Sequence, residues 1–145
     1  MPYFKFFNYG EPNAAEVDWS SAKVLQKIDG SLIKVVKFSS HEILVSTNGV
    51  IDAFKCELNS QIGSPYDNFG ELFWEAVCNQ MVDCGYPLDE NDPVEWLANK
   101  LLPYYTYMFE LCSPYNRVIV PHKETKLYFH GWRDNVSLNE IPFNI

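Results

Sequence analysis

The chain has 145 residues and a hydrophobic content of 47%, which allows a single domain with a real core. Its formal net charge of −8 argues against a protein that coats nucleic acid through general positive charge, so any contact with RNA requires a local basic strip. No run of about 18 apolar residues occurs, which excludes a membrane-spanning helix. The first residues lack a signal-peptide pattern and the four cysteines lack zinc-binding spacing, so we expect a cytoplasmic protein in a reducing compartment.

The first part of the chain has the pattern of short strands around a tight turn. Apolar and β-branched residues predict strands over residues 22–26 and 32–38, on either side of an Asp-Gly corner, and a third over 41–46. Thr-Asn-Gly at 47–49 indicates a turn. We expect strand or irregular structure over 50–58, followed by a loop.

A helical period replaces the strand pattern near the middle of the chain. Apolar residues at helical spacing predict a helix over residues 69–84, capped by Asp67 or Asn68 and ended by the following glycine. A second helix over 93–101 begins with Asp92 as its cap and a proline in its first turn.

Strand patterns return after the second helix. We predict strands over residues 104–112, 117–120 and 126–130, separated by proline-containing and asparagine-containing loops. Strands, two helices and more strands together predict an α+β fold with antiparallel sheets and inserted helices. We expect residues 1–145 to form one domain.

A lysine lies two residues before the Asp-Gly corner, in Lys27-Ile28-Asp29-Gly30-Ser31. A neutral, well-positioned lysine amine can attack phosphorus or carbonyl carbon, and a glycine lets the backbone approach a bound ligand closely. The same residues also fit a surface lysine beside an ordinary Asp-Gly turn. The motif becomes informative only together with the other segments of the chain.

Four segments carry patterns that occur together in one family. They are K-F-F-N-Y-G-E at residues 5–11, the lysine motif at 27–33, F-E-x-x-x-P-x-N-R within 107–120, and a strand with a G-x-R turn at 127–135. In this order they resemble the nucleotidyltransferase domain of ATP-dependent RNA ligases of the bacteriophage type. The resemblance implies a ligase-type nucleotidyltransferase core with an ATP-grasp-like fold.

The resemblance also implies a reaction in three steps. A lysine attacks the α-phosphorus of ATP and becomes adenylylated, AMP then passes to an RNA 5′-phosphate, and an RNA 3′-hydroxyl displaces the AMP. Phosphoryl transfer depends on positioning and on cations near the developing charge, so Mg²⁺ is expected beside ATP. The expected partners are therefore ATP and RNA ends, with no membrane.

By the same resemblance, Lys27 is the nucleophile and loses its ammonium proton before attack. Glu110 accepts hydrogen bonds from the ribose hydroxyls or helps to hold the metal. Leu25 and Gln26 lie where the family's backbone reads the adenine edge. Gly30 forms part of the nucleotide-binding corner.

Several other residues keep two interpretations each. Phe129 stacks on the base or packs in the core, with Tyr128 as a competitor for the stacking role. Asp29 steadies the corner or touches ATP. Arg117 binds phosphate or clamps a loop carboxylate. The histidines form no ligand pattern, so we expect surface or packing roles for them.

Two features depart from the family pattern. Asn48 stands where many relatives have a basic residue before glycine; as a nucleotide-binding residue its amide can hydrogen-bond a hydroxyl but cannot neutralise phosphate charge. The later E-G-x-V and K-x-K strands, which bind metal and the α-phosphate, have no match before Ile145, so we expect a partial core.

Missing cations would slow phosphoryl transfer by orders of magnitude. Alternatives to an active ligase are therefore one half of a split ligase that needs a complementary C-terminal chain or self-association, and a non-catalytic binder of nucleotides or RNA ends. An acidic protein that blocks a nucleic-acid enzyme by charge mimicry is a third class.

Overall fold

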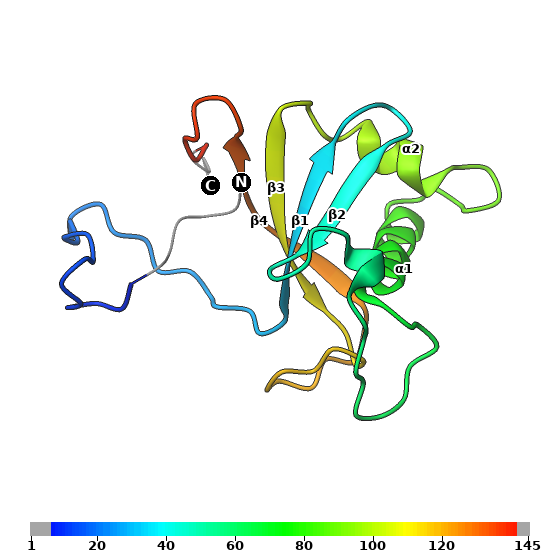
Figure 1. Cartoon of the computed structure of the whole chain (residues 1–145), viewed down its shortest axis with the longest axis horizontal. Coiled ribbons are helices and arrows are strands. Elements are labelled where there is room, and N and C mark those ends of the chain that lie inside the picture. Colours follow the sequence, from blue (N-terminus) through cyan, green and yellow to red (C-terminus); the bar gives the residue numbers. More distant parts are fainter. Residues whose placement is uncertain (1–6, 142–145) are drawn as a thin grey trace.

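The computed structural model describes residues 7–141 and is built on one antiparallel sheet (Figure 1). Its strands are β1 (Ser31–Lys37), β2 (Ile43–Thr47), β3 (Tyr105–Cys112) and β4 (Lys126–Asp134). They are arranged in the order β2-β1-β3-β4, and every neighbouring pair is antiparallel. The predicted mixture of helices with antiparallel strands is confirmed for the described residues.

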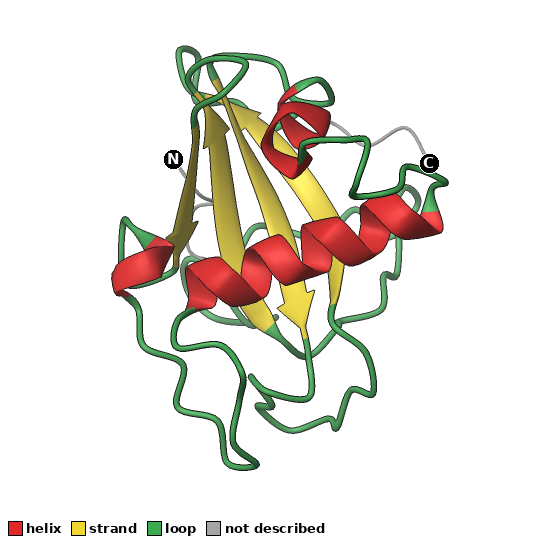
Figure 2. Ribbon diagram, turned by 90° about the vertical axis from the view of Figure 1, so that its right-hand side faces the viewer, coloured by secondary structure: helices red, strands yellow, loops and turns green. Residues whose placement is uncertain are grey.

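The helices lie between β2 and β3 in the chain and pack on the sheet. They are the short 3₁₀ helix η1 (Ala53–Lys55), α1 (Phe69–Asp83) and α2 (Pro93–Ala98). Figure 2 shows α1 running across one face of the sheet. The core between them contains Ile33, Val35, Val45, Leu72, Phe73, Val77, Met81, Tyr107 and Leu111. Burial of such apolar side chains is the main force that holds the two layers together.

Local capping residues fix both ends of α1. The Asn68 side chain accepts a hydrogen bond from the Glu71 N–H at 2.9 Å, which decides between the two predicted caps. At the other end Gly85 has φ +83°, and the N–H groups of Gly85 and Tyr86 return to the Val82 and Met81 carbonyls. This is the glycine-ended arrangement that closes many helices, as the sequence predicts.

Two predicted strands are wrong. Residues 22–26 form no strand, and Val24 and Leu25 are 100% and 71% exposed, so the segment has no core face to bury. Residues 117–120 are also irregular, because the N–H groups of Ile119 and Val120 donate to the Asp29 carboxylate instead of to a neighbouring strand.

Two element ends also differ from expectation. α2 stops at Ala98, although Leu101 remains buried, and the Lys37 ammonium donates to the Ala98 and Leu101 carbonyls at 2.8 and 3.1 Å. β4 continues four residues beyond the predicted end, to Asp134. Residues 50–58 are irregular apart from η1.

In the part of the chain that the structure describes, no helix is long and apolar enough to cross a bilayer.

The topology brings four predicted site segments to one end of the sheet. Because neighbouring strands are antiparallel, β1 and β4 begin where β2 and β3 end. The lysine motif precedes β1, the 47–49 turn follows β2, Glu110 lies near the end of β3 and Phe129 near the start of β4. The extended segment before β1 lies on the side of the sheet away from α1 (Figure 1).

Candidate functional site

Register places Glu110 on the sheet face opposite α1. Leu32, Glu110 and Tyr128 are paired across β1, β3 and β4, and so are Ile33, Phe109 and Phe129 in the next row. Successive strand residues point to opposite faces, and Ile33 belongs to the core beneath α1. Glu110 and Tyr128 therefore share the other face.

Lys27 lies at a cavity beside this end of β4. The cavity has a volume of about 440 Å³ and is lined by residues 25–28 and 128–130. It brings Leu25, Gln26 and Lys27 together with Tyr128 and an edge of β4, although these segments are about a hundred residues apart in the chain. An aromatic side chain, a lysine and exposed backbone in one cavity suit a base, its sugar and a phosphate.

Glu110 reaches the cavity through His130. Met108 pairs with Gly131 and Phe109 pairs with Phe129, so His130 is the extra residue of β4 at a β-bulge. The His130 Nε2 atom lies 3.4 Å from Glu110 Oε2, and His130 itself lines the cavity. The Glu110 side chain is only 12% exposed, so its carboxylate has few water partners and a fixed place.

Asp29 holds the β3–β4 connection against the lysine motif. Its Oδ2 atom accepts hydrogen bonds from the N–H groups of Ile119 and Val120 at 2.7 and 2.6 Å. The His122 ring nitrogen Nε2 donates to the Asp29 carbonyl. The two backbone N–H groups, first that of Val120 and then that of Ile119, lower the pKa of the Asp29 carboxyl below its usual value, because they bind the charged form.

We expect the Asp29→Asn substitution to destabilise the chain at neutral pH and to matter less in acid. The lowered pKa means that the folded state binds the Asp29 proton more weakly than the unfolded chain. The stabilisation is therefore complete above the ordinary carboxyl pKa of 3.8 and is lost as the pH falls through the lower pKa of the folded state. Denaturant unfolding of both proteins from neutral to acidic pH measures the difference.

The matched control is Asp89→Asn, which alters an exposed carboxyl that makes no hydrogen bond within the described residues. It should leave the free energy of unfolding close to that of the unsubstituted chain. A difference between Asp29→Asn and the unsubstituted chain that stays constant with pH would contradict the assigned role of the Asp29 carboxylate.

Gly30 lets β1 begin in close contact with β3. A Cβ atom at this position would lie 2.5 Å from the Leu111 carbonyl oxygen and 2.9 Å from Cys112 Sγ. The side-chain position of Gly30 is therefore filled by β3. This differs from the expected reason for the glycine, which was close approach of a ligand.

Comparison with known proteins connects this geometry to a family. A family model described as RNA ligase matches residues 1–143. The chain belongs to this RNA ligase family. An RNA ligase of Rhodothermus phage RM378 is 28% identical over 156 residues, an alignment that covers 91% of this chain and 32% of that protein. The chain thus spans about a third of the length of the curated relative that it matches.

In this member of the RNA ligase family, Tyr128 and Phe129, the two alternatives for contact with a base, lie on opposite faces of the sheet. The Phe129 ring lies 5.4 Å from the Phe109 ring and 6.2 Å from the Tyr107 ring, between centroids, on the core side of the sheet. Tyr128 is 40% exposed, shares the face of Glu110 and lines the Lys27 cavity. The geometry favours Tyr128 for contact with a base, although Phe129 also borders the cavity.

Asn48 and Arg117 lie at the same end of the sheet but outside the Lys27 cavity. Asn48 is exposed in the turn after β2, where the Thr47 N–H donates to the Val50 carbonyl at 2.9 Å. Arg117 Nε donates to the Ile119 carbonyl at 3.1 Å. Within the described residues Arg117 clamps no carboxylate, because Asp29 holds that loop through backbone N–H groups instead. The family's lead-in lysine, Lys5, lies outside the described residues.

His130 is the residue that sequence reasoning missed. We expected a surface or packing role for it, whereas the bulge brings it to Glu110 and to the cavity. The alternation of β4 marks Tyr128 and His130 as neighbours on one face, but only the register of β4 against β3 shows that Glu110 shares this face.

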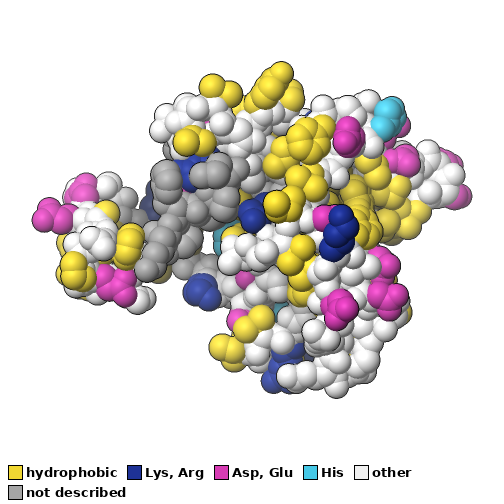
Figure 3. Space-filling model, in the orientation of Figure 1, with side chains coloured by type: hydrophobic (Ala, Val, Ile, Leu, Met, Phe, Trp, Pro, Cys, Tyr) yellow, Lys and Arg dark blue, Asp and Glu magenta, His cyan; other side chains and the backbone are white. Residues whose placement is uncertain are grey.

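The charged side chains are unevenly distributed on the face of the molecule that Figure 3 shows. In the view of Figure 3, acidic side chains gather on the N-terminal segment and at the opposite end, while Lys and Arg lie mainly between them and below.

Among the described residues no group of three or more His, Cys, Asp or Glu side chains could hold a metal ion. A divalent ion at this site would therefore need ligands from the nucleotide as well as from the protein.

Proposed function

We propose that this chain supplies the nucleotide-accepting part of an RNA ligase. The neutral Lys27 amine attacks the α-phosphorus of ATP, the bond to pyrophosphate breaks, and lysyl-AMP forms. The AMP then moves to an RNA 5′-phosphate, and an RNA 3′-hydroxyl displaces it as the strands join. In this proposal residues 1–145 act as one nucleotidyltransferase domain or as the first part of one.

The observation that carries the proposal is the common cavity of Lys27, Tyr128 and His130, with Glu110 beside it. A nucleophile is effective only when the reacting phosphorus is held next to it. Tyr128 offers a face for the adenine, and the backbone of Leu25 and Gln26 offers hydrogen-bonding groups for its edge. Family membership then makes adenylate the expected nucleotide.

The remaining site residues take supporting roles. Glu110 accepts ribose hydroxyls or provides one carboxylate for Mg²⁺, an ion that commonly binds through one or two carboxylates plus substrate phosphates. When bound, the ion would neutralise phosphate charge. Gly30 and Asp29 hold the lysine motif against β3 and the 117–120 segment. Asn48 and Arg117 would act on parts of the substrate beyond the cavity.

A non-catalytic binder of nucleotides or RNA ends is the second candidate. Lys27 is the one lysine or arginine among the described residues that line its cavity. Preorganised positive charge at the leaving phosphate normally contributes orders of magnitude in rate. Turnover by this chain would then need cations from a complementary chain or from a second copy.

The intact mass of the protein after incubation with ATP and Mg²⁺ tests the proposal. We expect a gain of one adenylate, together with release of one pyrophosphate. An unchanged mass with ATP-dependent thermal stabilisation would favour the binder. An unchanged mass without stabilisation would contradict both the lysyl-AMP proposal and a binder of nucleotides.

A further inference from the structure

A second cavity is lined in part by the start of the 117–120 segment. It has a volume of about 280 Å³ and is formed by the 57–62 loop, the start of β1, the start of α1 and residues 114–118. Ile119 and Val120, which follow its last lining residue, are the residues that bind Asp29. One short stretch of chain thus runs from this second cavity to Asp29, the residue that follows the 25–28 lining of the Lys27 cavity.

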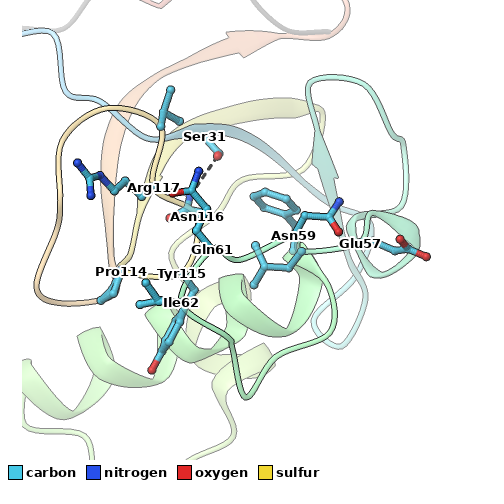
Figure 4. A pocket seen from close by; sticks show the side chains of 12 residues that line it. Ser31, Glu57, Asn59, Gln61, Ile62, Pro114, Tyr115, Asn116 and Arg117 are labelled. Carbon is cyan, nitrogen blue, oxygen red and sulfur yellow. Dashed lines mark hydrogen bonds between the residues drawn. The ribbon is translucent and has the colours of Figure 1, made fainter.

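The buried amide of Asn116 is the most informative group in this second cavity. The side chain is 8% exposed, and its Nδ2 donates to the Leu111 carbonyl at 2.8 Å and to Ser31 Oγ at 3.0 Å (Figure 4). Its Oδ1 has no hydrogen-bond partner among the described residues. Buried acceptors are almost always paired, so an unpaired oxygen on a residue that lines the cavity is unusual. Because Ser31 Oγ accepts from Asn116, the Ser31 hydroxyl hydrogen is available to an acceptor.

The other walls combine neutral amides with apolar surface. Asn59 and Gln61 provide two further amides, while Leu58, Ile62 and Phe69 provide apolar contacts. Figure 4 shows the charged side chains of Glu57 and Arg117 extending outward on opposite sides of the cavity. A neutral, partly apolar cavity with adjacent donors and acceptors suits a nucleobase better than a metal ion or a free phosphate.

We propose that this cavity binds one base of a single-stranded RNA, with Arg117 at its rim contacting the RNA backbone. Unstacked bases are recognised in this way, by amide and hydroxyl groups on their edges and by apolar contact with their faces. Among the described residues Arg117 makes a hydrogen bond through Nε alone, so its terminal guanidinium nitrogens are available to a phosphate. The choice of RNA as the ligand rests on the proposed function, whereas the cavity and its unpaired oxygen do not depend on it.

The test is the binding of a fluorescent, 5′-phosphorylated single-stranded RNA of about ten nucleotides, measured by anisotropy. The variant Asn59→Ala/Gln61→Ala removes two exposed amides of the cavity and leaves Asn116 in place. We expect its Kd to rise about fivefold or more, as loss of base-edge contacts requires. The control Asn13→Ala/Asn139→Ala removes two exposed amides elsewhere and should leave the Kd unchanged.

Arg117→Ala should also weaken RNA binding and reduce the salt dependence of the Kd. Its control is Lys123→Ala, which removes one positive charge from the same β3–β4 connection but outside the cavity. Photo-crosslinking with a thiouridine-containing RNA should label residues within 57–62 or 114–118. No measurable binding, an unchanged Kd in the cavity variants, or crosslinks confined to other segments would overturn the proposal. ATP-dependent mass gain is expected to persist in Asn59→Ala/Gln61→Ala, so failure of this proposal is distinguishable from failure of the lysyl-AMP proposal.

Discussion

Replacement of Lys27 by alanine is expected to abolish the ATP-dependent gain of one adenylate completely. The covalent bond forms at the side-chain nitrogen, and the cavity offers no second lysine among its described lining residues. His130 also borders the cavity, but its ring lies beside Glu110, 3.4 Å from the carboxylate. A nucleophile cannot be replaced by the positioning groups around it, so the loss should be total rather than partial.

The control for this loss is Lys23→Ala, which removes another exposed lysine from the same extended segment. It should gain adenylate as the unsubstituted chain does. Because Lys27 is exposed in an irregular segment, its substitution should leave the thermal unfolding midpoint nearly unchanged. Adenylate gained by Lys27→Ala, found at another side chain by peptide mapping, would contradict the assignment of the nucleophile.

Elements with local signals could be predicted from the sequence, and α1 is the clearest case. Its apolar spacing, its Asn68 cap and its Gly85 ending are all encoded within the helix and its flanks. The 117–120 segment shows the opposite case. Its β-branched residues favour a strand, but Asp29, about 90 residues earlier, takes its N–H groups and keeps it irregular. Such a tertiary contact leaves no local pattern.

The candidate site likewise contains residues that have a local sequence signal and residues whose place depends on tertiary contacts. The lysine motif and the F-E-x-x-x-P-x-N-R run are each continuous in sequence, so the resemblance to RNA ligases could point to Lys27 and Glu110 without a structure. The faces of the β4 aromatics depend on the bulge opposite Met108, which no local pattern predicts. Only the register shows that Tyr128 lies beside Glu110, while Phe129 lies beside Phe109. Asn116 holds its loop through a hydrogen bond to the Leu111 carbonyl, but its unpaired oxygen is visible only in the folded chain.

Gly30→Ala is expected to lower both the stability of the chain and the rate of adenylate transfer. The added Cβ would lie 2.5 Å from the Leu111 carbonyl oxygen, and this backbone atom cannot move aside without disturbing the pairing of Ser31 with Leu111. Overpacking of this kind typically costs about 1–3 kcal/mol in the free energy of unfolding. Denaturant unfolding measures the cost, and the rate of mass gain with ATP measures the effect on Lys27.

Gly49→Ala is the matched control, since a Cβ at this glycine would meet no atom within 4 Å. Its free energy of unfolding should change by less than about 0.5 kcal/mol. The Cβ of Gly30→Ala would also lie 3.0 Å from Glu110 Cγ, so the substitution presses on the carboxylate and on the lysine motif together. Slower transfer without lost stability would show that Gly30 serves the ligand directly, as the sequence alone suggested. Unchanged stability and an unchanged rate would instead contradict the close packing of the corner on β3.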